Sequence, residues 1–128
     1  MKHQQEEIIK NYVESYNNFD IKGMIRDLDQ HVVFENITND KVDLQINGID
    51  AFEQQAESAK SHFSVRNQEI EFWHFNESNI TIDIHYTAVL AMDLSNDLKA
   101  GSTLELKGKS EFVIEGGKIK EIRDYSSR

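Results

Sequence analysis

The second half of the chain alternates apolar and polar residues over a stretch that only an extended strand accommodates. Every second residue from Ile80 to Leu94 is apolar, and the residues between them include Asp83 and His85. A period of two places one set of side chains on each face of a strand. The same alternation runs through residues 102–115. A sheet with one apolar face and one polar face therefore dominates the C-terminal half.

The first half has the spacing of amphipathic helices instead. Five apolar residues recur at helical intervals and predict a helix over residues 3–18: Ile8, Ile9, Tyr12, Val13 and Tyr16. Asp20 is placed to cap a short second helix. Asp50 and Glu53 resemble a capping box, which predicts a third helix over residues 50–62.

The order of these elements indicates an α+β fold. Short strands are expected at residues 31–37 and 42–46, and long antiparallel strands at residues 65–75, 79–95, 102–115 and 118–126. The Gly116-Gly117 pair predicts a hairpin between the last two strands. Strands this long should curl around the three helices and form a cone with an internal pocket. Such concave spaces commonly bind small molecules.

Length and charge narrow the classes of protein and partner. The 128 residues fit one domain, residues 1–128, and the net charge of −9 disfavours nucleic acid and anionic membranes as partners. The absence of cysteine excludes disulfides and thiolate metal sites. No apolar run approaches the roughly 20 residues that span a membrane, and no secretory leader is visible. The expectation is a cytoplasmic protein without a cofactor.

Several segments together resemble one known superfamily. They are residues 11–13, 17–20, 32–36, 48–52, 117–119 and 122–125, which span nearly the whole chain in the expected order. In order and spacing they are similar to nuclear transport factor 2-like proteins. That superfamily includes ketosteroid isomerases and SnoaL-type polyketide cyclases. The resemblance implies a single SnoaL-like domain.

The resemblance also assigns candidate catalytic residues. Tyr12 falls where ketosteroid isomerases place an oxyanion-binding tyrosine, Asn36 where they place the general base, and Ser110 where they place a second oxyanion donor. An amide has no pKa near neutrality, so Asn36 disfavours steroid isomerisation. Asp124 matches an acidic residue that acts as general acid and base in SnoaL-type cyclases. The candidate catalytic residues are therefore Asp124, Tyr12 and Asn36.

Strand alternation predicts that Asp124 faces the pocket, because Ile122 two residues earlier should face the helices. An apolar pocket would raise the pKa of the carboxyl toward neutrality. We expect Asn36, or the hydroxyl of Tyr12 or Tyr16, within its reach. In the alternative interpretation, Asp124 is an edge carboxylate paired with a neighbouring basic residue.

The remaining candidates are predicted to contact a small apolar ligand. They are Tyr16, Phe34, Phe52, Trp73, Ser110 and Ile122. For the aromatic residues, simple core packing is the competing interpretation. His74 and His85 could approach one another on adjacent strands. A zinc site needs three or four converging ligands, so no metal is expected.

Three functions remain open at this stage: a cofactor-independent acid/base enzyme, a non-catalytic binder of a small apolar molecule, and an association domain. Family members often pair through the outer face of the sheet, which predicts a homodimer here. The side chains expected on that face carry both signs of charge: Asp83, His85, Lys107 and Lys109. A polar, hydrated interface fits them.

Overall fold

The structure is a computed structural model, and it describes residues 2–126. Three helices and six strands follow one another in this order: α1 (Lys2–Asn17), α2 (Ile21–Ile25), β1 (Leu28–Thr38), β2 (Lys41–Asn47), α3 (Ile49–Lys60), β3 (Phe63–Phe75), β4 (Ile80–Leu90), β5 (Thr103–Glu115) and β6 (Lys118–Ser126). Within the described residues, no helix is long and apolar enough to cross a membrane.

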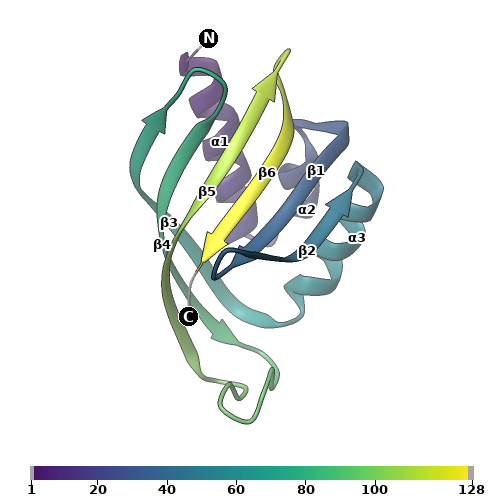
Figure 1. The fold of residues 1–128 in the computed structure, drawn as a ribbon. Coiled ribbons are helices and arrows are strands. Elements are labelled where there is room, and N and C mark those ends of the chain that lie inside the picture. Colours follow the sequence, from purple (N-terminus) through teal and green to yellow (C-terminus); the bar gives the residue numbers. More distant parts are fainter. Residues whose placement is uncertain (1, 127–128) are drawn as a thin grey trace.

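All six strands form one curved sheet in the order β2-β1-β6-β5-β4-β3, and the three helices lie against one side of it (Figure 1). The predicted α+β fold is confirmed. The four long strands pair antiparallel, as expected. β1 and β6 pair parallel, however, so the sheet is mixed. This pair joins the first strand to the last and makes the N-terminal hairpin continuous with the long strands.

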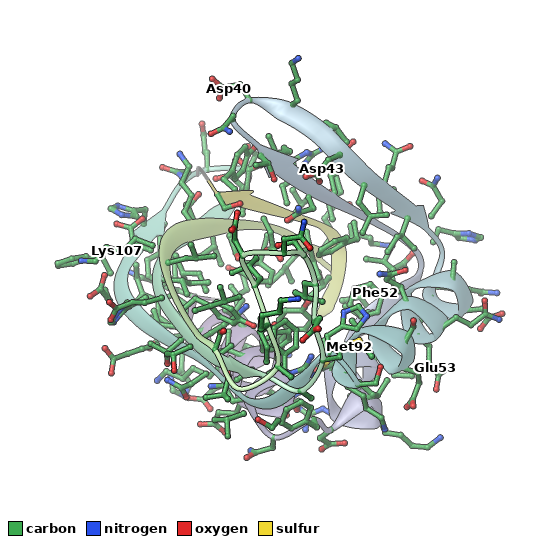
Figure 2. All side chains as sticks on the ribbon, turned by 90° about the horizontal axis from the view of Figure 1, so that it is seen from below. Asp40, Asp43, Phe52, Glu53, Met92 and Lys107 are labelled. Atoms are coloured by element: carbon green, nitrogen blue, oxygen red, sulfur yellow. The ribbon has the colours of Figure 1, made fainter. Side chains whose placement is uncertain are left out.

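The core lies between the concave side of the sheet and the helices. Its most deeply buried large side chains come from α1 and four strands: Ile9, Val32, Ile82, Leu90, Phe112, Ile119 and Ile122. The alternation that predicted these strands places the charged residues on the other side. In Figure 2, Lys107 projects outward from the sheet.

One predicted helix cap is confirmed and another is wrong. The Asp20 carboxylate accepts a hydrogen bond from the Gly23 backbone N–H at 3.0 Å and caps α2. By contrast, α3 begins at Ile49, and its N-cap is Gly48 rather than Asp50. Gly48 has φ +93° and donates its backbone N–H to the Val32 carbonyl. A glycine adopts this left-handed turn readily, so the chain enters the helix before Asp50.

β4 ends earlier than the sequence pattern predicted. Met92 and Leu94 lie exposed in the β4–β5 loop, which projects beyond the body of the sheet in Figure 1. The backbone there bonds locally: Leu94 N–H donates to the Leu98 carbonyl, and Ala100 N–H donates to the Asp93 carboxylate. These local hydrogen bonds take the place of β-sheet pairing after Leu90. The alternation of apolar residues continues in the sequence to Leu94, although β4 ends at Leu90.

Candidate functional site

A cavity of about 350 Å³ lies between α1, α3 and the concave side of the sheet; we call it the main cavity. Its wall is mostly aromatic and aliphatic, with contributions from Tyr12, Phe34, Ile46, Phe52, Ala56 and Phe63. A side cavity of about 200 Å³ opens against β4, β5 and β6. The two share Tyr16, Asn36, Gln68 and Asp124 on their walls. The main cavity has the size and lining of a small-molecule site.

The carboxyl group of Asp124 lies where the two cavities meet. It projects from β6 to the concave side and accepts a hydrogen bond of 2.6 Å from the Ser110 hydroxyl of β5. Burial raises the pKa of Asp124 to about 6, and the Ser110 hydrogen bond opposes this rise. A carboxyl with this pKa exchanges its proton near neutral pH, as a general acid or base requires.

The hydrogen-bond partners of Asp124 differ from those expected. Ser110 holds the carboxylate, whereas the side-chain amide of Asn36 donates to Asp43 at 2.9 Å. The Tyr16 hydroxyl pairs with the Tyr86 hydroxyl at 2.9 Å. Asn36 and Tyr16 still line the same cavities as Asp124. The structure thus brings these candidates together without the hydrogen bonds the sequence suggested.

Tyr12 stands on the helical wall of the main cavity. Its ring packs against Phe52 and Phe112, with ring centroids 6.4 and 5.8 Å away. Burial, followed by the nearby charge of Asp124, raises the pKa of Tyr12 well above its usual value. The hydroxyl therefore stays protonated at neutral pH and is available as a hydrogen-bond donor.

The other ligand candidates divide between the cavity and the core. Phe34 and Phe52 line the main cavity, and Ser110 lines the side cavity. Ile122 is fully buried in the core, and Trp73 stacks on Phe75 with ring centroids 5.7 Å apart. These last two lie outside the set of described residues that line either cavity.

Sequence reasoning missed Arg66 of β3, which is only 3% exposed and lines the main cavity. Its Nε donates to the Tyr16 carbonyl at the end of α1, at 2.7 Å. The guanidinium carbon lies 3.8 Å from the centre of the Tyr16 ring and 4.4 Å from that of Phe19. The sequence shows a charged residue on one side of an alternating strand, but the alternation alone does not tell which side faces inward.

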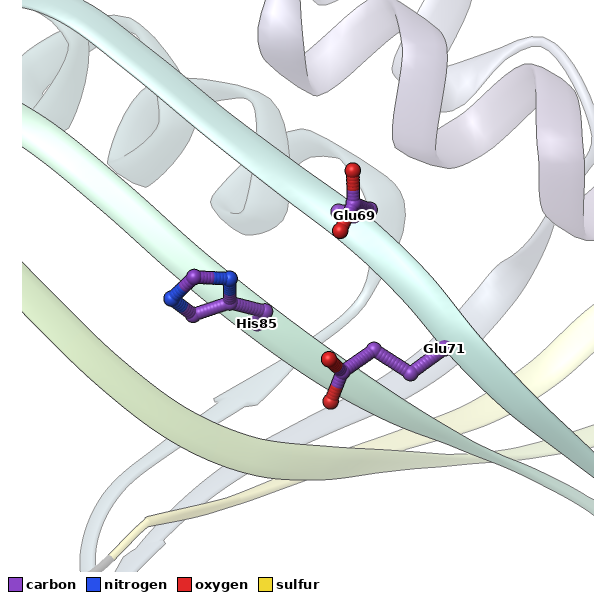
Figure 3. A group of neighbouring side chains, drawn as sticks. All are labelled: Glu69, Glu71 and His85. Carbon is purple, nitrogen blue, oxygen red and sulfur yellow. The ribbon is translucent and has the colours of Figure 1, made fainter.

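On the opposite face of the sheet, Glu69 and Glu71 of β3 lie beside His85 of β4 (Figure 3). Their potential ligand atoms lie within 4.8 Å of one another. The group is already engaged with its neighbours, because His85 pairs with Glu105 at 2.9 Å and Glu71 with Lys107 at 3.8 Å. We therefore interpret it as part of the charge pairing of the outer face.

Comparisons with known proteins agree with this architecture. No protein-family model matches the chain, and no curated protein sequence matches it. Among solved structures, a protein assigned as a polyketide cyclase from Xanthomonas campestris pv. campestris is similar, at TM-score 0.82 and 17% identity, over 96% of this chain and 90% of that one. An LEH-like epoxide hydrolase of M. tuberculosis matches at TM-score 0.77 and 12% identity, over 97% and 83%.

A third structure, TerC co-crystallised with polyporic acid, matches at TM-score 0.76 and 13% identity, over 96% of this chain and 91% of that one. Proteins described as NTF2-like and as having a ketosteroid isomerase-like fold match as well. The chain therefore has the fold of the NTF2-like and ketosteroid isomerase-like proteins, which confirms the fold that the motifs implied.

Proposed function

We propose that the chain binds a small apolar molecule in the main cavity and performs cofactor-independent acid/base chemistry on it. The observation that carries this proposal is the Asp124 carboxyl, which lies at the junction of the two cavities with a pKa raised to about 6. Isomerisation, dehydration, cyclisation and hydrolysis all need a group that accepts and returns a proton in this pH range. Asp124 is the carboxyl among the described residues lining the main cavity.

In this proposal, Asp124 takes a proton from the bound molecule and Tyr12 donates a hydrogen bond to the oxygen on which negative charge develops. The raised pKa of Tyr12 supports a donor role, because the hydroxyl keeps its proton. A donor in a buried site stabilises developing charge more strongly than water does. Asn36, on the walls of both cavities, would orient the ligand through its amide.

A non-catalytic binding protein is the second candidate function. The mostly aromatic and aliphatic wall favours binding even without chemistry, and the Ser110 hydrogen bond gives Asp124 a structural partner. TerC, which shares the fold, was co-crystallised with polyporic acid. That structure supports a small-molecule ligand under either candidate function. Measuring turnover distinguishes an enzyme from a non-catalytic binding protein.

Ligand binding in the main cavity is tested by filling it. Ala56 of α3 lines the cavity, whereas Ala51 of the same helix is exposed to solvent. With 2-naphthamide as a neutral bicyclic probe, Ala56→Phe should weaken binding about tenfold or more, because the added ring occupies the probe's volume. Ala51→Phe is the matched control and should leave the affinity unchanged. Isothermal titration calorimetry measures both, and equal affinities for the two variants would contradict a ligand site here.

We also propose that two copies pair through the outer face of the sheet. Phe72 and Val65 are exposed there beside charged residues, at 64% and 57% of their full exposure. A mixture of apolar and charged groups is typical of a non-obligate interface. Light scattering should give twice the 14.9 kDa chain mass, and Phe72→Glu should shift the particle toward the monomer. A 14.9 kDa particle at all working concentrations would exclude the dimer.

A further inference from the structure

Arg66 is placed in the main cavity by contacts that use only part of its guanidinium group. Nε donates to the Tyr16 carbonyl near the C-terminus of α1, which also accepts a hydrogen bond from the Phe19 backbone N–H, and the rings of Tyr16 and Phe19 lie against the guanidinium. Phe19 adopts a left-handed conformation with φ +57°, which a residue with a side chain adopts only at some cost. The turn after α1 thus places the Phe19 ring against this arginine.

One nitrogen of the guanidinium, Nη2, is buried and lacks a hydrogen-bond partner among the described residues. No carboxylate in the described part of the chain forms an ion pair with Arg66, and that of Asp124 is held by Ser110. Burying an unpaired cationic donor is costly, so such groups are normally paired or hydrogen-bonded. A purely structural cap of α1 would need Nε alone and does not explain the free Nη2.

The side chains of the cavity wall indicate which class of ligand group would pair with Arg66. Arg66 and Asp124 are the charged side chains among the described residues on the main cavity wall. A guanidinium edge matches the planar oxygens of a carboxylate. One cation balances one negative charge, so a doubly charged phosphate fits this wall less well. The remaining wall is uncharged and mostly aromatic and aliphatic, and it suits a hydrocarbon or aromatic body.

We propose that Arg66 binds the carboxylate of the ligand, and that the ligand class is an apolar monocarboxylate. This inference rests on the proposed function, since it assumes that the main cavity binds a small molecule. It adds the ligand's charge and the residue that recognises it.

The test compares two probes that share one ring system, 2-naphthoate and 2-naphthamide, by isothermal titration calorimetry. At pH 5.5 the Asp124 carboxyl is mostly protonated, so it adds little repulsion. The wild type should bind the carboxylate about tenfold more tightly than the amide, or more, as expected for a charge-assisted hydrogen bond. Arg66→Gln keeps a donor for the Tyr16 carbonyl and should abolish this preference, whereas Arg66→Lys should keep part of it.

Arg26→Gln is the matched control, because Arg26 is exposed and paired with Asp27. It should leave the preference unchanged. Equal affinity of the wild type for both probes, or a preference that survives Arg66→Gln, would overturn the inference while leaving a ligand-binding cavity. Failure of both probes to bind the wild type would overturn the inference together with the proposed cavity function. The comparison of the two probes on the wild-type protein needs no variant. It therefore tests the inference even if the Arg66→Gln protein folds poorly.

Discussion

Asp124→Asn is expected to slow a model proton abstraction in the main cavity by about 10²–10⁴-fold. The probe is 5-nitrobenzisoxazole, a small apolar molecule that loses its C–H proton to a base while its N–O bond breaks, giving a coloured cyanophenolate. A carboxylate in an apolar site should perform this step, and Asn keeps the shape of Asp without its basicity. Absorbance of the phenolate measures the rate.

The pH dependence and two control variants make this test specific. The carboxylate is the reactive form, so the wild-type rate should rise as the pH increases through about 6. Ser110→Ala removes a hydrogen bond that lowers the pKa of Asp124, and it should move this rise to higher pH. Asp83→Asn changes a carboxylate of the outer face, paired with His74, and should have no effect. Equal rates for Asp124→Asn and the wild type would remove Asp124 from the chemistry.

Asp124→Asn is also expected to stabilise the fold by about 3 kcal/mol at pH 8. The carboxyl has a pKa of about 6 when folded, against an ordinary value of 3.8. A raised pKa means that the folded state holds the proton more tightly than the unfolded chain does. Stability from this group is therefore fully present below pH 3.8 and is lost as the pH rises through about 6. Asn stays neutral and avoids that loss.

Urea unfolding at pH 8 and pH 4 measures the effect. The free energies of unfolding of Asp124→Asn and the wild type should differ at pH 8 and converge at pH 4, where the folded-state carboxyl is protonated. The Asn side-chain oxygen can still accept the Ser110 hydroxyl, so packing is preserved. A variant that is less stable than the wild type at pH 8 would show that Asp124 contributes structurally as an anion. A gain in stability with a loss of proton transfer is the usual trade-off at an active site.

The sequence predicts the orientation of Asp124 well but not its hydrogen bond. A simple two-residue hairpin at Gly116-Gly117 would place Ser110 opposite Arg123, continuing the register that pairs Glu115 with Lys118. A bulge at Val113/Ile114 shifts the pairing by one residue and places Ser110 opposite Asp124. Bulges depend on the packing of the whole sheet, so the alternation of one strand does not reveal them.

A second bulge explains why the sequence did not predict that Arg66 lies on the cavity wall. Arg66 and Ile70 share the inward side of β3, and simple alternation would then point Phe72 inward and Trp73 outward. The register shift between Ile70 and Phe72 reverses this, so Phe72 is exposed and Trp73 packs against the core. With the inward side of β3 undecided, the buried arginine could not be assigned to the cavity. The positions of the helices and of the long strands along the chain, by contrast, follow from hydrophobic period.

Titration of Asp124 by NMR, following its carboxyl ¹³C chemical shift from pH 3 to pH 8, tests directly whether this group exchanges a proton near neutral pH. Assignment comes from the signal that disappears in Asp124→Asn. We expect a midpoint near pH 6, because burial at the cavity junction outweighs the Ser110 hydrogen bond. A midpoint at or below the ordinary value of 3.8 would contradict it, since Asp124 would then be a hydrogen-bonded structural anion and not a proton carrier.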